Sequence, residues 1–407
     1  MTVDDFGVGF PIETITEGRV KIVVPKLDAY VSKFSDYAPS KAPVFYNPVM
    51  ELNRDLSMLV VQAYQHTVDR ELSVCEPLSS SGIRGVRYAA EVRGVKNVII
   101  NDISARAVKL ASHNVELNSL SNQVKVENKD ANCLLSCYGA PKKRFDVVDL
   151  DPFGSPVPYL DSAIRALRNN GLLAVTATDL APLCGVHSKA CIRKYGGKPL
   201  RTEYCHELAI RLLLGGIVSS AAKQEIGTRA IFSHSTDHYV RVYLEIQYGA
   251  KKADESIKNL GYILHCFNCL HRESVESLLY LKTEKCPECG SRLDYSGPLW
   301  VGKILDSQFC ELVSRENAQR ALRNNARIAQ LLTLAKKEAE APPTYYVTDK
   351  LSGKLSLPAP SVGALIKALR DGGFETVQTH FSSRGFKTEA PALKVQERLK
   401  VLATSSI

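Results

Sequence analysis

A carboxylate, two prolines and an aromatic ring follow directly after an apolar run in the middle of the chain. Residues 145–150 are followed by Asp151-Pro152-Phe153-Gly154-Ser155-Pro156. At the end of a buried strand, the Asp151 carboxylate can accept hydrogen bonds from an exocyclic amine, and the Phe153 ring can stack on a flat base. The prolines stiffen the turn between them. A strand-end turn with a capping Asp is the alternative interpretation.

A second candidate site is the run of small residues Ser79-Ser80-Ser81-Gly82, between a strand-like run (72–78) and a helix-like run (83–91). Small residues there let a ligand approach the backbone and the helix N-terminus. Twenty residues after Gly82, the run 98–102 ends in Asp102, a spacing that suits a carboxylate binding the two hydroxyls of a ribose.

The type of nucleotide-like ligand can be narrowed from the same loop. A nicotinamide dehydrogenase would carry G-x-G-x-x-G to bind a pyrophosphate, and here a single Gly85 follows Ser-Ser-Ser-Gly. S-adenosylmethionine has no phosphate and needs only a close turn, a ribose acid and an adenine pocket. The loop therefore favours S-adenosylmethionine over a dinucleotide.

The elements that position these residues have the pattern of a parallel sheet. Further strand-like runs at 124–127, 145–150 and 171–179 alternate with helical stretches, which predicts a doubly wound, Rossmann-like α/β sheet. Ligands of such sheets bind at the carboxyl ends of the strands. Four acids lie at or just past those ends: Asp102, Asp130, Asp151 and Asp179. A single acid there is usually a helix cap, but four along one edge are harder to explain as caps alone.

A third signal is a set of four cysteines at Cys266, Cys269, Cys286 and Cys289. Their spacing is that of a four-cysteine zinc ribbon, in which two tight knuckles present four thiolates to one ion. His265 and His271 flank the first pair, but four thiolates already complete a tetrahedral site, so neither is expected to be a ligand. The ion is predicted to be structural, and a redox role for the pairs is the alternative.

Composition is consistent with a large intracellular protein. The 407 residues, 45% of them hydrophobic, suffice for two or three domains. The other seven cysteines show no disulfide framework, residues such as Asp4 and Asp5 begin a chain without a signal-peptide pattern, and no run of eighteen apolar residues suggests a membrane span. We expect a cytoplasmic protein without membrane association and with no obligate protein partner.

Charge agrees with a polyanionic partner without identifying one. The net charge is +9, and residues 341–407 hold nine Lys or Arg against five Asp or Glu. Basic proteins of this kind attract nucleic acid, although many metabolic enzymes are equally basic.

Several sequence blocks occur together in an order typical of one family. They are residues 44–50 with Asn53-Arg54-Asp55, then residues 81–88, 101–104, 149–156, 176–179, 182–185 and 237–241. Together they resemble the tRNA (guanine-N2)-dimethyltransferases that modify guanine 26, in their archaeal form. The resemblance covers roughly residues 10 to 385, and its most specific parts are Phe-Tyr-Asn-Pro and Asp-Pro-Phe-Gly-Ser-Pro.

The resemblance implies roles for individual residues. Asp151 matches the catalytic acid, and Phe45 and Phe153 match aromatic residues that sandwich the target base. The positions that match cofactor-binding residues are Arg54, Arg84, Asp102, Asp130 and Ala131. Without the resemblance, Phe45 would be taken as a core aromatic and Arg54 as a surface charge.

The residue patterns also indicate a domain organisation. Residues 1–250 are predicted to form an S-adenosylmethionine-dependent methyltransferase domain with an N-terminal extension, and residues 251–407 a smaller α+β domain that contains the zinc ribbon. The helix-then-strand pattern with scattered basic residues near the C-terminus suits tRNA contacts, and structural packing is the equal alternative. Residues 251–255 are expected to be a polar joint, residues 304–340 helical, residues 361–371 a helix capped by Ser361, and residues 375–380 a strand.

Two other function classes remain open from the sequence. One is a different amino-group methyltransferase that acts on another RNA, on DNA or on a protein glutamine. The other is a non-catalytic RNA-binding protein built on a methyltransferase scaffold, against which the acids at the strand ends argue. The sequence does not decide between the addition of one methyl group and two.

Overall fold

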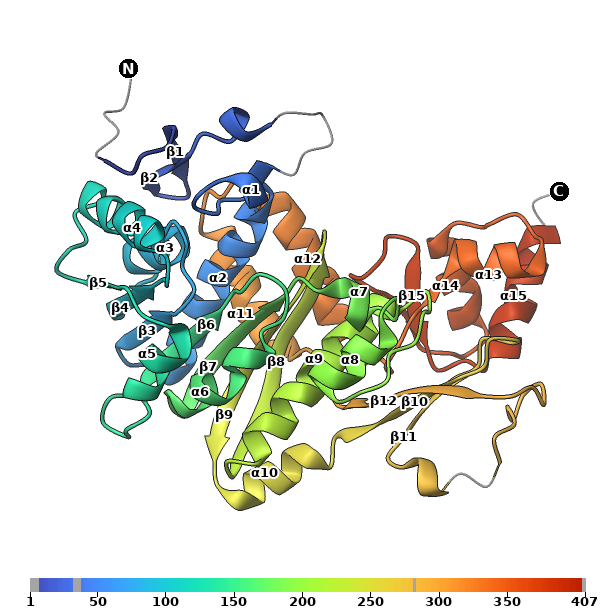
Figure 1. Cartoon of the computed structure of the whole chain (residues 1–407). Helices are drawn as coiled ribbons and strands as arrows, with labels where there is room; N and C mark the ends of the chain where they lie inside the picture. Colours follow the sequence, from blue (N-terminus) through green and yellow to red (C-terminus); the bar gives the residue numbers. More distant parts are fainter. Residues whose placement is uncertain (1–6, 32–37, 281–282, 405–407) are drawn as a thin grey trace. The chain divides into compact units, whose positions relative to one another are not determined.

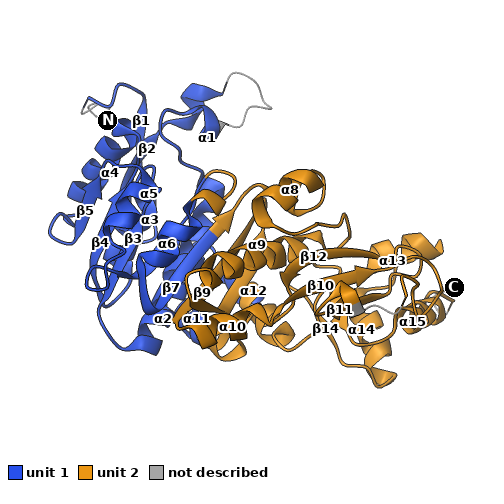
Figure 2. Ribbon diagram, turned by 60° about the horizontal axis from the view of Figure 1, so that its bottom comes forward, with its two compact units in different colours: residues 1–152, 159–175, 312–330 blue, residues 153–158, 176–311, 331–407 orange. Residues whose placement is uncertain are grey.

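The computed structural model describes residues 7–31, 38–280 and 283–404. Asp4 and Asp5, used above for the signal-peptide prediction, lie outside these residues. The chain divides into two compact units that interleave in sequence (Figure 2). Unit 1 comprises Met1–Pro152, Tyr159–Val175 and Leu312–Gln330, and unit 2 comprises Phe153–Pro158, Thr176–Glu311 and Leu331–Ile407.

The main sheet has seven strands in the order β5-β4-β3-β6-β7-β9-β8. They are β3 (Leu72–Glu76), β4 (Val95–Asn101), β5 (Val124–Glu127), β6 (Phe145–Leu150), β7 (Leu167–Ala177), β8 (Ile226–Thr236) and β9 (Tyr239–Tyr248). The first five strands of the order pair in parallel, and β8 pairs with β9 as an antiparallel hairpin. The predicted Rossmann-like α/β fold is confirmed.

Strand order locates the ligand-binding edge of this sheet. The chain runs from β3 outward through β4 to β5, and then returns to β6 on the other side of β3. The direction of winding therefore reverses between β3 and β6, which pair through Val74–Val147 and Cys75–Val148. In doubly wound sheets the ligand crevice lies at such a reversal, beyond the carboxyl ends of the strands. Glu76 and Asp151 stand at those two ends.

The helices of unit 1 follow the strands in alternation, as the pattern predicts (Figure 1). They are α2 (Glu51–Val68), α3 (Ile83–Glu91), α4 (Ala105–Leu117), α5 (Ala131–Cys137) and α6 (Leu160–Arg165). A separate hairpin of β1 (Ile12–Glu17) and β2 (Val20–Pro25) precedes them. The region predicted as helical from residue 304 to 340 forms two helices, α11 (Ser307–Ala318) and α12 (Asn325–Glu338).

Unit 2 places three helices after β7, namely α7 (Leu180–Leu183), α8 (Ser188–Tyr195) and α9 (Cys205–Ala222). By length and composition α9 passes as a membrane span, with a mean hydropathy of 1.3. However, 67% of these 18 residues are buried inside the protein, and Glu207 of this helix pairs with Arg211 at 2.8 Å. The helix is apolar because it lies in the core of unit 2.

The joint predicted at residues 251–255 is part of a helix, α10 (Ala250–Ile257). Lys251, Lys252, Asp254 and Glu255 lie on its exposed side, whereas Ala253 and Ser256 are buried. The Ser256 hydroxyl accepts a hydrogen bond from the backbone N–H of Thr228 at 2.8 Å. The prediction of a joint was wrong because one buried face of two small residues leaves little apolar signal in the sequence.

Two small sheets complete unit 2. The first has the order β11-β10-β12, from β10 (Leu260–His265), β11 (Arg272–Val275) and β12 (Asp294–Trp300). The second has the order β13-β15-β14, from β13 (Tyr346–Val347), β14 (Thr376–Gln378) and β15 (Gly385–Thr388), with helices α13 (Thr348–Leu355), α14 (Val362–Asp371) and α15 (Ala392–Thr404). The Ser361 cap of α14 is confirmed, since its side chain accepts from the N–H of Ala364 at 3.1 Å.

Candidate functional site

The Asp151 carboxylate lies against a buried arginine at the carboxyl edge of the sheet. Its Oδ2 accepts a hydrogen bond from Nη2 of Arg84, and 19% of the Asp151 side chain is exposed. Arg84 comes from the first turn of α3, directly after the small-residue loop, and is 2% exposed. The catalytic candidate and one of the cofactor candidates are therefore in direct contact.

Several other polar side chains fix the Arg84 guanidinium. Nη1 donates to the Asn53 side-chain oxygen at 2.9 Å and to the Ser57 hydroxyl at 2.7 Å, both on α2. Two more carboxylates lie nearby, Glu76 at 3.7 Å and Asp149 at 3.8 Å. The guanidinium is thus held in one orientation by two side chains of α2 and lies beside acidic side chains from two strand ends.

Glu76 is a buried acid that the sequence analysis did not single out. Its Oε2 accepts the backbone N–H of Gly85 at 2.8 Å, and a Cβ at Gly85 would lie 2.9 Å from that same oxygen. Burial raises the pKa of Glu76 to about 8, even though Arg84 and the Gly85 hydrogen bond act to lower it. Gly85 is therefore required for close packing of α3 on the end of β3.

Ser80 connects two predicted site residues to the loop. Its backbone N–H donates to Oδ2 of Asp102 at 2.8 Å, and its hydroxyl donates to the backbone carbonyl of Phe45 at 2.7 Å. Its φ of 50° lies in the left-handed region, which a tight turn requires. The other Asp102 oxygen accepts the N–H of Ser104 at 2.9 Å. Asp102 and Phe45, which are far apart in sequence, thus meet at the loop.

Arg54 supports the segment that carries Phe45. Nε and Nη2 form a two-pronged pair with the Glu17 carboxylate, at 2.6 Å each, and Nη2 also donates to the Asn47 carbonyl at 3.2 Å. Arg54 is buried, so the alternative of a surface charge is wrong. The guanidinium lies 5.4 Å from the centre of the buried Tyr46 ring.

Asp130 and Ala131 begin α5, beyond the end of β5. The exposed Asp130 caps this helix, with one carboxylate oxygen accepting the N–H of Cys133 at 3.0 Å, while Ala131 is buried. Capping uses one lone pair of the carboxylate and leaves others for a ligand.

The turn after Asp151 belongs to unit 2, where it is tied to the end of β7. The Gly154 N–H donates to the Thr178 hydroxyl at 2.8 Å, and the Thr178 N–H donates to the Gly154 carbonyl at 3.0 Å. Ser155 donates to the hydroxyl of Tyr195 at 2.9 Å, and this hydroxyl donates to Asp179 at 2.6 Å. The Phe153 side chain is 65% exposed, as a stacking platform requires.

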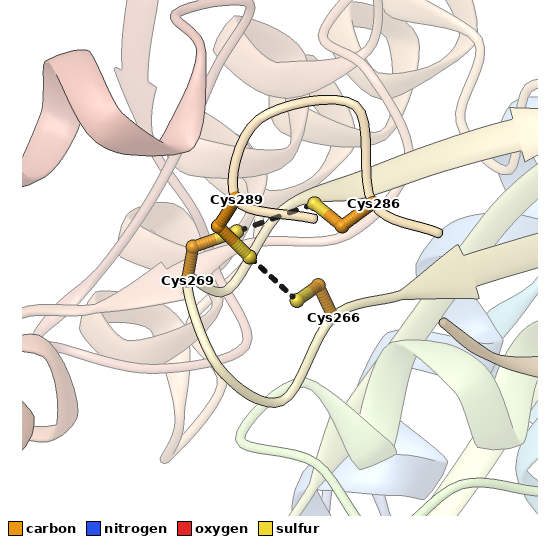
Figure 3. Close-up of side chains that lie close together, drawn as sticks. All are labelled: Cys266, Cys269, Cys286 and Cys289. Atoms are coloured by element: carbon orange, nitrogen blue, oxygen red, sulfur yellow. Dashed lines mark hydrogen bonds between the residues drawn. The ribbon is translucent and has the colours of Figure 1, made fainter. Parts of the chain in front are cut away.

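The four predicted zinc ligands lie together in unit 2 (Figure 3). The sulfur atoms of Cys266 and Cys289 are 3.5 Å apart, as are those of Cys269 and Cys286. A backbone hydrogen bond closes each knuckle: the Leu270 N–H donates to the Cys266 carbonyl, and the Gly290 N–H donates to the Cys286 carbonyl. Gly290, at φ 72°, supplies the left-handed conformation that the second knuckle needs. Four sulfurs at this separation fit a tetrahedral zinc site.

The two flanking histidines have other partners. Nδ1 of His265 shares a hydrogen bond with the Tyr204 hydroxyl at 3.1 Å, and burial lowers the pKa of His265 to about 3. His271 pairs with Glu288 at 2.7 Å. Glu288 in turn accepts the N–H groups of Ala392 and Leu393 at the start of α15. The knuckles therefore cap a helix of the C-terminal part of the chain.

Three residues that support the site were missed from the sequence: Glu76, Ser80 and Tyr195. Ser80 lies in the loop already identified, and its three-serine composition was the available signal. Glu76 lies inside the predicted strand-like run of residues 72–78 and ends β3 only in the structure, so it was not counted among the strand-end acids. Tyr195 is forty residues away from its partner Ser155, and nothing in the sequence reveals that contact.

A family model and close relatives match almost the whole chain. The model described as "N2,N2-dimethylguanosine tRNA methyltransferase" matches residues 18–400. A tRNA (guanine(26)-N(2))-dimethyltransferase of Methanobrevibacter smithii is 43% identical over 397 residues, covering 98% of this chain and 99% of the relative. A tRNA (guanine(26)-N(2)/guanine(27)-N(2))-dimethyltransferase of Aquifex aeolicus is 37% identical, covering 96% of each.

A solved structure agrees with these sequence matches. Trm1 from Pyrococcus horikoshii, in complex with S-adenosyl-L-methionine, is 34% identical, with a TM-score of 0.82, and covers 95% of this chain and 99% of that chain. Sequence, fold and the strand-end arrangement of acids thus agree, and the chain belongs to the N2,N2-dimethylguanosine tRNA methyltransferase family.

Proposed function

We propose that this protein transfers methyl groups from S-adenosylmethionine to the exocyclic N2 amine of guanine 26 in tRNA. The observation that carries the proposal is the Asp151 carboxylate, held by Arg84 at the winding reversal of the sheet, in a chain whose relatives are named for that reaction. Asp151 is the catalytic residue in this proposal.

The Asp151 contacts suggest how the amine is oriented. The guanine N2 amine is a poor nucleophile because its lone pair is delocalised into the ring. Arg84 engages Oδ2 of Asp151, so Oδ1 is the oxygen that would accept one amine hydrogen, while the carbonyl of Pro152 would accept the other. This orients the lone pair, and the carboxylate can take the proton as nitrogen becomes positive.

The cofactor site would be formed by the loop of Ser79 to Gly82, Asp102, and Asp130 with Ala131. The Ser80 N–H and Ser104 N–H each use one lone pair of an Asp102 oxygen, which leaves acceptor capacity for ribose hydroxyls. When bound, S-adenosylmethionine supplies a methyl group activated by its sulfonium. Arg84 and Arg54 are proposed to bind the cofactor as well, and their contacts also support Asp151 and the Phe45 segment respectively.

Phe45 and Phe153 are proposed to stack on the two faces of the target base. A guanine within folded tRNA is stacked, so it must be turned out to reach a carboxylate at a sheet edge. Ser80 anchors the Phe45 backbone beside the loop, and Phe153 is 65% exposed at the turn that follows Asp151.

Residues 251–407 are proposed to form the accessory domain, with a structural zinc ion on Cys266, Cys269, Cys286 and Cys289 and with contacts to tRNA. The close set of four sulfurs supports the ion, and the excess of basic residues after residue 341 supports the contacts. We place the protein in the cytoplasm, where tRNA and reduced thiols are found.

The test is methyl transfer to an unmodified tRNA transcript with methyl-labelled S-adenosylmethionine, followed by digestion of the RNA to nucleosides. Label in N2-methylguanosine or N2,N2-dimethylguanosine, lost when guanine 26 is replaced, is the expected result. The ratio of the two nucleosides over time separates addition of one methyl group from addition of two. Label at another nucleotide, or none despite cofactor binding, would overturn the assignment and favour a different amino-group substrate.

A further inference from the structure

A second group of metal-ligand side chains lies in unit 2, outside the four-cysteine site. One ligand atom from each of Cys184, Cys205 and His206 lies within 4.8 Å of the others. The ligand atoms of the four-cysteine site lie within the same distance of one another. Cys184 follows α7, and Cys205 and His206 are the first two residues of α9. Nothing in the proposed methyl transfer uses these three side chains.

The fold brings the two segments together through a close backbone approach. Gly185 has a φ of 90°, and a Cβ there would lie 2.9 Å from the backbone nitrogen of Arg201 and 3.0 Å from the Leu200 carbonyl carbon. Only glycine permits this packing. The Cys184 thiol then lies 3.6 Å from the Cys205 carbonyl oxygen. The close approach of Gly185 to Leu200 and Arg201 thus brings Cys184 near the start of α9.

The donors suit a metal in kind as well as in position. Cys205 stands at the N-terminus of an 18-residue helix, where the helix dipole favours the thiolate that binds metal. Within the described residues, the His206 imidazole makes no hydrogen bond or ion pair, and its one charged neighbour is the imidazole of His238. It is half-buried, as is Cys205, so one side of the cluster faces solvent. An imidazole beside two thiols supplies three of the four donors of a tetrahedral zinc site.

We propose that Cys184, Cys205 and His206 bind one zinc ion, in addition to the ion of the four-cysteine site. Zinc binds thiolate at about 2.3 Å and imidazole at about 2.0–2.1 Å, so tetrahedral ligands stand roughly 3.5–3.8 Å apart. Side chains already within 4.8 Å reach this geometry by small rotations. Two thiolates and one imidazole leave the fourth position to water on the solvent side.

The ion would fasten the segment that follows Asp179 to the start of α9. Asp179 ends the chain of hydrogen bonds that begins at Ser155, and α7 begins at the next residue, Leu180. The zinc ion would therefore act as a clip that limits motion of this segment. A disulfide between Cys184 and Cys205 is the competing use of the thiols, but it would leave His206 without a role.

The test measures the zinc content of the full-length protein. The protein is purified under reducing conditions with zinc supplied, and weakly bound metal is removed by gel filtration. Two equivalents per chain are expected for the wild type and one for Cys184→Ala. The control Cys191→Ala removes a buried cysteine of the same unit from outside the cluster and should keep two. One equivalent in the wild type, or two in Cys184→Ala, would overturn the proposal.

Cobalt replacement gives a second readout that does not need activity or the Cys184 variant. With the four-cysteine site blocked by Cys289→Ser, cobalt should still give thiolate charge-transfer absorption and the visible bands of a tetrahedral site. His206→Gln, which keeps both thiols, should weaken cobalt binding at least tenfold in that background. Unchanged cobalt affinity, or a Cys184–Cys205 disulfide found by mass spectrometry in the protein as purified, would count against the zinc site.

Discussion

Asp151 pairs with the guanidinium of Arg84, which is itself fixed by hydrogen bonds to other side chains. Because Arg84 is fixed by Asn53 and Ser57 and lies 3.8 Å from the Asp149 carboxylate, it keeps an acidic partner when the Asp151 carboxylate is removed. A variant at Asp151 leaves no unpaired buried charge, the usual cause of misfolding at such sites. The chemical role of Asp151 can therefore be measured in a folded protein.

Asp151→Ala is expected to lower kcat by about 10²-fold or more, the range for a positioned acid or base. The Kd for S-adenosylmethionine should change little, because the proposed contacts of the cofactor lie on other residues. Single-turnover methylation and calorimetric binding measure the two quantities. Asp161→Asn, an exposed carboxylate of α6, is the control. Near-normal turnover in Asp151→Ala would remove Asp151 from the mechanism.

Glu76 should make the stability of the protein depend on pH. Burial raises its folded-state pKa to about 8, above an unfolded value of 4.5, so the folded state favours the protonated acid. Its contribution is fully present below about pH 4.5 and is lost as pH rises through 8. Glu76→Gln keeps an acceptor for Gly85 and removes the titration. We expect the Tm of the variant relative to the wild type to rise between pH 5 and pH 9. A constant Tm difference would show that Glu76 is ionised in the folded protein.

The Asp-Pro-Phe-Gly-Ser-Pro turn depends on two neighbouring elements for its shape. The end of β7 binds Gly154 through Thr178, and α8 binds Ser155 through Tyr195. Tyr195 is 4% exposed, and burial raises its pKa, so its hydroxyl stays protonated and can donate to Asp179. These bonds fix the turn that carries Phe153.

Tyr195→Phe removes the hydroxyl that joins Ser155 to Asp179 and should lower kcat by up to about 10²-fold, the cost of a small displacement of catalytic parts. As a positioning residue it should leave the KM for S-adenosylmethionine unchanged. Tyr204→Phe also loses a buried hydroxyl bond in unit 2, to His265, and should keep its kcat. Equal losses in both variants would indicate a general effect on stability.

The zinc knuckles are expected to stabilise the C-terminal elements of unit 2. Leu270 packs in the same core as Leu365, Phe386 and Leu399, and Glu288 caps α15. Cys289→Ser should therefore lower the Tm by several degrees and speed proteolysis after residue 341, since zinc binding is coupled to folding. The exposed Cys133→Ser is the control. An unchanged Tm in a Cys289→Ser protein shown to lack that zinc would refute a structural role.

Within unit 2, one buried ion cluster joins distant parts of the chain. Glu207 of α9 pairs with Arg211 at 2.8 Å and with Lys387 of β15 at 3.0 Å, and all three side chains are almost fully buried. Burial alone would raise the pKa of Glu207, but the charges of Lys387 and Arg211 outweigh it and hold the pKa at about 2. The C-terminal sheet is thereby anchored to the core helix of its unit.

Glu207→Gln should cost about 3–5 kcal/mol of unfolding free energy, because it leaves Lys387 and Arg211 with less compensation in the interior. In the wild type, the stabilisation from Glu207 is present above about pH 4.5 and is lost as pH falls through 2. Urea unfolding at pH 7 and pH 3 measures both effects. The exposed ion pair of Lys367 and Asp371 supplies the control, Asp371→Asn, for which little or no loss is expected. A cost as small as that of the control would contradict the anchoring role.

Much of this architecture is determined by local sequence. An apolar run of strand length predicted β3, small residues before a helix predicted the loop, and Ser361 before an amphipathic stretch predicted α14. These signals are local because the alternation of buried and exposed residues and helix capping act over a few residues. The four cysteines were predictable for the same reason, since metal knuckles have short fixed spacings. Where the apolar signal was small, as in α10, prediction from the sequence failed.

Contacts between distant segments were decided by the tertiary structure alone. Phe45 meets Ser80, Arg84 meets Asp151, Ser155 meets Tyr195, and Cys184 meets Cys205, and each pair is separated by more than twenty residues. The sequence determined which residues stand at strand ends, because hydrophobic period and residue type are local properties. Which of those residues touch depends on strand order and on where helices pack, and these follow from burial of the whole chain.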